Sequence, residues 1–169
     1  MPIREEEKMK SFRIGLMVVA AMLGGIGLAQ AQTAKDLVGA WRLVSNIGVM
    51  PDGTKNLNPT FKGMAMFDAD GNFILLNARS DLPKFQSNNR LTGTAEENKA
   101  VVGGSISYWG TFTVENRDIN LKIEGGSWGA WNGTVQNRVI VSLTADELIY
   151  SLPASANGGS NEHGFKRIK

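Results

Sequence analysis

Few residues in this chain could carry out chemistry by themselves. It has one histidine, His163, and no cysteine among its 169 residues. The lack of cysteine excludes disulfides, thiolate catalysis and cysteine-ligated metals. A histidine can act as a general base, but no nucleophile motif accompanies His163, which follows Glu162 after a glycine-rich stretch. The local sequence therefore favours a solvated loop residue over a catalytic one.

The segment from Asp68 to Asn72 resembles the start of a calcium-binding loop. Such a loop needs glycine at its sixth position and glutamate at its twelfth. Counted from Asp68, Gly71 is fourth and Arg79 is twelfth, so the pattern does not fit calcium. We interpret the segment as a hairpin turn, and we expect no metal or cofactor.

A larger group of side chains could form the wall of a pocket for an apolar molecule. They occupy alternate, inward-compatible positions of three expected strands: Met64, Met66, Phe73, Leu75, Tyr108 and Phe112. Methionine adapts well to irregular apolar ligands, although such residues can equally fill a core. Asn77, Arg79 and Tyr108 could orient a ligand. A buried Arg79 without a partner would be costly, so it either leaves at the rim or meets an anionic group.

Short alternating segments separated by turn residues must position these side chains, and this pattern predicts an antiparallel all-β domain. We expect seven or eight strands, with ranges 41–47, 62–67, 73–79, 105–115, 119–124, 135–143, 147–152 and 164–168. One helix is expected over residues 95–102, because Thr94 and Glu97 form a capping box. It should end at Gly103 and Gly104.

Sequential antiparallel strands with one apolar face can remove their edges by closing into a barrel. About eight strands leave room for side chains or one small ligand. We therefore predict an up-and-down barrel of about eight strands, with an open sandwich as the alternative. The connection over residues 80–104 is too long for a simple loop. We expect its helix to form a lid over the open end, with Phe85 or Leu91 as a plug.

Several of these residues resemble a known family. The first strand opens with Gly39-Ala40-Trp41, and the middle of the chain contains residues 89–97 (NRLTGTAEE) and 106–112 (ISYWGTF). Together they resemble the bacterial lipocalin-like domain family, over about residues 37–169. The resemblance implies a barrel with a cavity, in which a cation from the last strand, here Arg167, covers the indole of Trp41. Members often carry histidine where this chain has Asn120 and Lys122, so any role of that histidine does not carry over.

The N-terminus has the features of a secretory signal peptide. Basic residues precede an apolar run over residues 14–28, and Ala29-Gln30-Ala31 fits a cleavage site. We expect residues 1–31 to be removed, leaving one domain over residues 32–169 in the periplasm or outside the cell, without a membrane span. Translation could start at Met1 or at Met9, and an uncleaved anchor is the alternative.

These observations favour an exported carrier or scavenger of a small hydrophobic or amphipathic molecule. Lys and Arg total 18 against 16 Asp and Glu, a balance that argues against nucleic-acid binding. One alternative is a barrel enzyme of the isomerase, cyclase or hydratase type, with Tyr108 and either Arg79 or Glu124 as its acid–base pair. The other is a structural or interaction domain with a filled barrel. Fold class alone does not choose among them.

Overall fold

The computed structural model describes residues 32–153 and 158–169. The expected signal peptide, residues 1–31, lies outside these described residues. Within them, no helix is long and apolar enough to cross a membrane.

Nine antiparallel strands of the described residues form one sheet, in the order β2-β1-β3-β4-β5-β6-β7-β8-β9. The strands are β1 (Gly39–Val49), β2 (Lys55–Leu57), β3 (Phe61–Phe67), β4 (Asn72–Arg79), β5 (Ser105–Glu115), β6 (Asp118–Gly126), β7 (Val135–Leu143), β8 (Glu147–Leu152) and β9 (Ser160–Arg167). The short helices are α2 (Ala34–Leu37), α3 (Ala95–Gly104) and the single 3-10 turn η1 (Gly129–Trp131).

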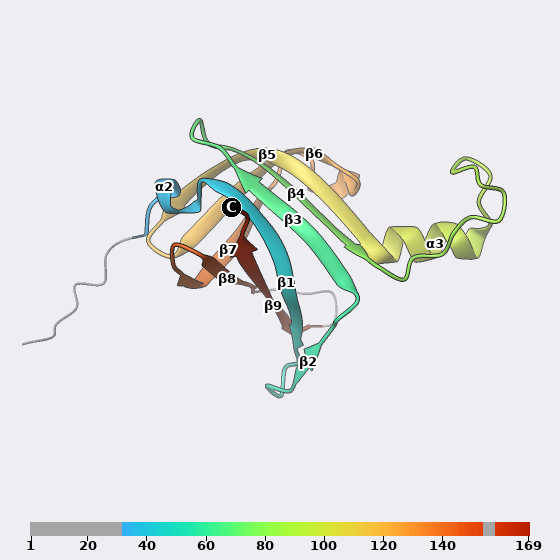
Figure 1. The fold of residues 1–169 in the computed structure, drawn as a ribbon, viewed down its shortest axis with the longest axis horizontal. Coiled ribbons are helices and arrows are strands. Elements are labelled where there is room, and N and C mark those ends of the chain that lie inside the picture. The colour runs from blue at the N-terminus through green and yellow to red at the C-terminus, as the bar shows by residue number, and fades with distance from the viewer. Residues whose placement is uncertain (1–31, 154–157) are drawn as a thin grey trace, which may run out of the picture. The chain divides into compact units, whose positions relative to one another are not determined.

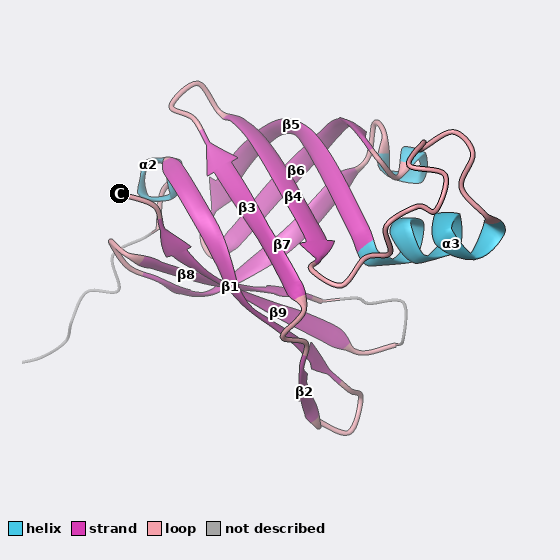
Figure 2. Cartoon of the chain, turned by 45° about the vertical axis from the view of Figure 1, so that its right-hand side comes forward, coloured by secondary structure: helices cyan, strands magenta, loops and turns pink. Residues whose placement is uncertain are grey.

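The sheet closes because β1 pairs with both β3 and β9. Eight strands, β1 and β3–β9, thus form a closed barrel, while β2 is a side strand on the far half of β1 (Figure 2). This confirms the predicted up-and-down barrel. The closure leaves no exposed edge in the eight-stranded part, which removes a template for aggregation.

Alternation of apolar and polar residues decides which side chains face the interior. In β6, Ile119, Leu121 and Ile123 are each 1% exposed, while at the alternate positions Asn120 is half-buried and Lys122 and Glu124 are exposed. A strand with this period buries one face and solvates the other. The core of the barrel is the sum of such inward faces, and the face predicted for this strand is confirmed.

The short helix α2 lies at one end of the barrel (Figure 1), and the pair Trp41 and Arg167 lies at the same end. Trp41 is fully buried and donates its indole N–H to the carbonyl of Leu37 at 2.8 Å. The Arg167 guanidinium lies 4.0 Å from the centre of the indole ring and donates to the carbonyl of Val38. A cation over an indole face is favourable, so the expected contact is present at this end, which we call the closed end.

Gly39 explains the glycine of the Gly-x-Trp motif. Its φ is +130°, a conformation that side chains disfavour. A Cβ at this position would come 2.7 Å from Nη1 of Arg167. Glycine is therefore needed for Arg167 to reach over Trp41.

The prediction that the connection over residues 80–104 forms a lid is wrong. The capping box is present, with Glu97 N–H donating to Thr94 Oγ1 at 3.2 Å and Thr94 N–H donating to Glu97 Oε2 at 2.8 Å. However, α3 runs directly into β5 and projects away from the barrel (Figures 1 and 2). Leu91 is 81% exposed and plugs nothing. Most residues of α3 are exposed, because its short sequence offers no broad apolar face to bury over the opening.

Candidate functional site

Most of the predicted wall residues face the barrel interior. On β4 and β5, five of them are at most 5% exposed: Phe73, Leu75, Asn77, Tyr108 and Phe112. The register places Leu75 beside Tyr108 on the neighbouring strand. The structure therefore brings these five together on one inner wall.

The inward positions predicted for Met64 and Met66 are wrong. Met64 and Met66 are 38% and 50% exposed and lie on the outside of β3. The inward positions of β3 hold the fully buried Ala65 and the 3% exposed Phe67 instead. Ala65 is the cross-strand partner of Trp41, and the buried indole leaves room there for only a small side chain.

Arg79 leaves the barrel at the end of β4, which was one of its two expected positions. Its side chain is exposed and forms an ion pair with Asp81, with Nη2 and Oδ2 2.7 Å apart. Glu124 is also exposed, on the outer face of β6. Neither can face Tyr108 inside the barrel, so the acid–base pair expected for an enzyme is not formed by these residues.

The interior instead contains polar side chains from five different strands. We call this group the interior polar cluster; it consists of Asn77, Tyr108, Arg138, Tyr150 and His163. Their exposed fractions are 3%, 4%, 3%, 1% and 9%, respectively. Burying polar groups is costly unless they find partners, so the contacts of each member decide what the cluster can do.

Arg138 of β7 is the only charged member at neutral pH. Its Nη1 donates to its neighbour's carbonyl, that of Asn137, at 2.7 Å, and its Nη2 donates to the hydroxyl of Tyr108 at 3.3 Å. The guanidinium also lies 6.0 Å from the ring centre of Trp131. Its Nε has no hydrogen-bond partner, and no carboxylate of the described residues forms an ion pair with it.

His163 is buried inside the barrel, and its interpretation as a solvated loop residue is wrong. The last strand, β9, begins at Ser160, four residues earlier than predicted, and the register places His163 beside Tyr150 of β8. The two ring centres are 5.5 Å apart. Burial, and to a lesser extent the charge of Arg138, lower the pKa of His163 to about 4. The imidazole is therefore neutral at neutral pH.

Tyr150 adds a hydroxyl to the same region. Burial raises the pKa of Tyr150 strongly, Tyr108 raises it further and the charge of Arg138 opposes the shift. The phenol consequently stays protonated and can donate. The Tyr150 hydroxyl, His163 Nδ1 and Asn77 Oδ1 all lack a hydrogen-bond partner among the described residues. Several buried polar groups in one interior, each without a partner, need a physical explanation.

The two ends of the interior differ in packing. Toward the closed end, aromatic rings fill the space, with Phe67 and Phe112 edge to face at 4.9 Å. The opposite end, which we call the mouth, is lined by the half-buried residues Ile106, Gln136, Leu152 and Asn161. The interior polar cluster lies toward this end, because Tyr108, Arg138, Tyr150 and His163 are each two residues along their strand from one of these half-buried residues.

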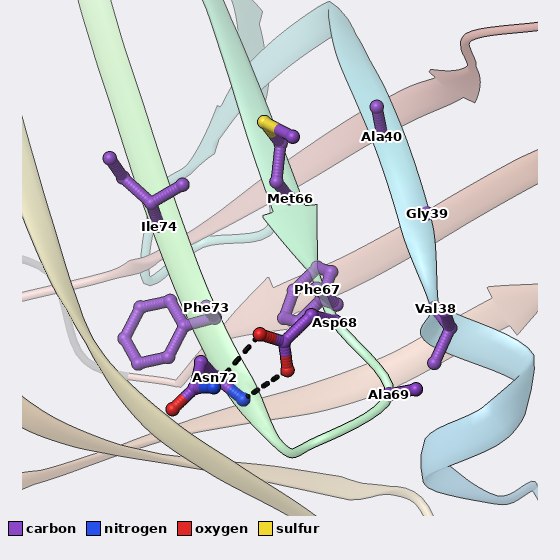
Figure 3. Close-up of a pocket in the computed structure, with 10 residues that line it drawn as sticks. All are labelled: Val38, Gly39, Ala40, Met66, Phe67, Asp68, Ala69, Asn72, Phe73 and Ile74. Atoms are coloured by element: carbon purple, nitrogen blue, oxygen red, sulfur yellow. Dashed lines mark hydrogen bonds between the residues drawn. The ribbon is translucent and has the colours of Figure 1, made fainter.

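A hollow lies on the outside of the barrel and has a volume of about 560 Å³ (Figure 3). We call it the outer groove; it lies between the start of β1 and the β3–β4 hairpin, with Met66 and Ile74 on its wall. Its carboxylate, Asp68, is already engaged, because it accepts from the backbone and side-chain nitrogens of Asn72 at 2.8 Å each. The groove thus offers a ligand apolar contact, while its only carboxylate is already hydrogen-bonded.

No group of three or more histidines and carboxylates that could hold a metal occurs among the described residues. The segment that resembles a calcium loop is a hairpin turn. Asp68 Oδ1 accepts from the backbone N–H of Asp70 at 2.9 Å, and Gly71 has a φ of +86°.

Sequence reasoning missed Arg138 and Tyr150, although both carry a readable signal. Arg138 lies two residues before the fully buried Ile140, and Tyr150 lies two residues after the fully buried Leu148. Because side chains in a strand alternate, residues of the same parity share a face. An arginine at a position that shares a face with buried apolar residues predicts a charged side chain inside the protein, where it needs a partner.

The match to a known protein family agrees with this architecture. A family model described as a lipocalin-like domain matches residues 38–166. No curated protein matches the chain. Among solved structures, a lipocalin-like protein from Bacteroides uniformis is 14% identical, with a TM-score of 0.45, covering 79% of this chain and 99% of that one. A de novo designed fluorescence-activating β-barrel is 12% identical, with a TM-score of 0.38 and coverage of 80% and 96%.

Proposed function

The chain belongs to the lipocalin-like domain family, and from that premise we propose that it binds a small amphipathic molecule inside its barrel. The observation that carries this proposal is the interior polar cluster, in which four buried side chains, those of Asn77, Arg138, Tyr150 and His163, each have a polar atom without a hydrogen-bond partner among the described residues. Pockets for small molecules combine apolar walls with a few placed polar groups. The barrel interior supplies both, with aromatic walls next to the cluster.

The ligand of this proposal occupies the half of the barrel next to the mouth. Aromatic side chains fill the closed end, so its polar end meets the cluster and its apolar part lies among the half-buried residues around Ile106 and Leu152. In this proposal the half next to the mouth matches the predicted ligand-binding barrel, and the closed half matches the filled-barrel alternative.

A carrier or scavenger role outside the cytoplasm fits the N-terminal sequence. Export rests on the basic residues, the apolar run and the Ala29-Gln30-Ala31 site, as argued above. An intact mass of protein recovered from outside the cytoplasm tests it. Cleavage after Ala31 predicts a chain that begins at Gln32, whereas a chain retaining the apolar run contradicts export by a cleaved signal peptide.

Binding inside the barrel is tested by two matched substitutions on strands. Ile106→Trp narrows the mouth, and Ile74→Trp makes the same change on the exposed wall of the outer groove. The neutral fluorescent probe N-phenyl-1-naphthylamine reports apolar binding. We expect Ile106→Trp to weaken its binding about ten-fold, because the larger ring blocks the entrance, and Ile74→Trp to change it less than about two-fold.

Other outcomes would contradict the proposal in different ways. Loss of binding in Ile74→Trp alone would place the ligand in the outer groove. No binding to the wild-type protein, together with no small molecule retained in native mass spectrometry, would favour a barrel that is filled throughout. Circular dichroism of both variants confirms that the barrel still folds.

A further inference from the structure

We propose that the ligand carries a single negative charge, as in an aliphatic carboxylate, and that Arg138 is its charge partner. This inference rests on the proposed binding in the barrel and specifies the ligand's chemical class. It depends on three features of the interior: a buried cation without a counterion, neutral hydrogen-bonding groups around it, and apolar rings on either side.

The first feature is the isolation of the Arg138 charge. A guanidinium presents several N–H donors in a rigid fork that matches a carboxylate. In the structure, Arg138 is 3% exposed and uses part of this fork on the Asn137 carbonyl and the Tyr108 hydroxyl. Nε has no partner, and no carboxylate among the described residues compensates the charge. Burying an unpaired charge is strongly unfavourable, and an anionic ligand would offset that cost.

The second feature is the set of groups that surround the cation. His163 is neutral at neutral pH, Tyr150 stays protonated, and Tyr108 already contacts the guanidinium. The Tyr150 hydroxyl can donate to a ligand oxygen, and His163 Nδ1 can donate or accept in its neutral state. The interior polar cluster therefore carries one net positive charge. One carboxylate balances it, whereas a doubly charged phosphate would bury an uncompensated charge.

The third feature is the apolar surface that flanks the cluster. Tyr108 packs edge to face against Trp131, with ring centres 5.3 Å apart, and lies 5.9 Å from Phe73. On the other side, Tyr150 lies 5.3 Å from the ring of Phe165. A headgroup held by Arg138 would thus have aromatic rings beside it. An aliphatic chain could extend from it toward Ile106 at the mouth.

Isothermal titration calorimetry with octanoate, octanol and octyl phosphate tests this inference, because the three probes differ in their headgroups. At neutral pH we expect the wild-type protein to bind octanoate at least about ten-fold more tightly than octanol, since charge-assisted hydrogen bonds are the stronger ones. Octyl phosphate should bind more weakly than octanoate, because its second charge lacks a counterion.

Substitutions then assign the effect to Arg138. Arg138→Met removes the charge and keeps an apolar chain of similar length; we expect it to lower octanoate affinity about ten-fold and to leave octanol affinity within about two-fold. The matched control is Arg42→Met, an exposed arginine on the outer face of β1, which should alter neither. If Arg138→Met does not fold, Arg138→Lys and Tyr150→Phe replace it. Each should weaken octanoate binding and spare octanol.

The outcomes separate the two proposals. Equal affinity of the wild-type protein for octanoate and octanol would overturn the anionic ligand and leave binding in the barrel standing. Equal losses in Arg138→Met and Arg42→Met would overturn the role of Arg138. If none of the three probes and no neutral fluorescent probe binds, the anionic ligand and the proposed function both fail.

Discussion

The charge state of His163 follows from where β9 begins. Because the strand starts before His163, the imidazole lies in the interior next to Tyr150 rather than in solvent. Burial penalises its charged form, and the nearby Arg138 adds to this, so its pKa falls from 6.5 to about 4. The folded protein therefore resists protonation of His163, while the unfolded chain accepts the proton at the ordinary pKa.

This difference predicts a specific pH dependence of stability. Above pH 6.5 the imidazole is neutral in both states and does not change the free energy of unfolding. As the pH falls from about 6.5 to 4, His163 is protonated in the unfolded state but stays neutral in the folded state. The free energy of unfolding should fall by about 3 kcal/mol over this window. Urea unfolding across this pH range measures it.

His163→Gln is the control for that measurement, because glutamine does not titrate. We expect the variant to lose much less stability than the wild-type protein between pH 6.5 and 4. The carboxyl groups with lowered pKa values, including Asp36 and Asp68, lose their contributions at lower pH. Parallel pH curves for the two proteins would contradict the buried, neutral imidazole.

At the scale of elements, β3 shows that shifting the inward face of a strand by one residue exchanges the side chains that line the interior. Its sequence around Ala65 alternates two sets of apolar residues, so the pattern alone does not choose the inner face. We expect Ala65→Leu to destabilise the protein by about 1–3 kcal/mol, because the added atoms meet the buried Trp41 on the next strand. Met66→Lys on the exposed face should cost less than about 0.5 kcal/mol.

The midpoints of urea unfolding for these two variants distinguish the faces directly. The reverse order, with Met66→Lys the more damaging, would mean that the methionines face inward as first predicted from the sequence.

Strands with clean alternation were predictable from sequence. The strand predicted over residues 105–115 has those bounds in β5, and the inward series of β6 was assigned correctly. The register shift in β1 between Leu43 and Ser45 was not predictable, because no glycine or proline marks it. The same applies to the start of β9, where the glycine-rich stretch around Gly159 favours a loop in any local analysis.

The candidate site was harder to predict than the strands that build it. Phe73, Leu75, Asn77, Tyr108 and Phe112 were recognised as inward from their own strands. Arg138 and Tyr150 were missed, although the parity of their own strands places them inward, and their role depends on meeting His163 inside the barrel. That meeting depends on tertiary pairing between segments distant in sequence, which no local pattern contains.

At the scale of the whole molecule, closure turns separate strands into an enclosed interior. β1 makes this possible because it pairs with β9 along most of its length and with β3 at its start (Figure 2). Closure also removes Arg138 from water. Because electrostatic interactions strengthen as water is excluded, the charge of a bound ligand should strongly affect its affinity. The fold and the proposed ligand chemistry are thus linked through one buried cation.

A crystal structure of the protein grown with octanoate is the most direct measurement of that link. The account predicts electron density for the ligand inside the barrel, with a carboxylate oxygen within hydrogen-bonding distance of the Arg138 guanidinium and the alkyl chain directed toward Ile106. Density in the outer groove beside Met66 and Ile74, with Arg138 left as it is now, would contradict it.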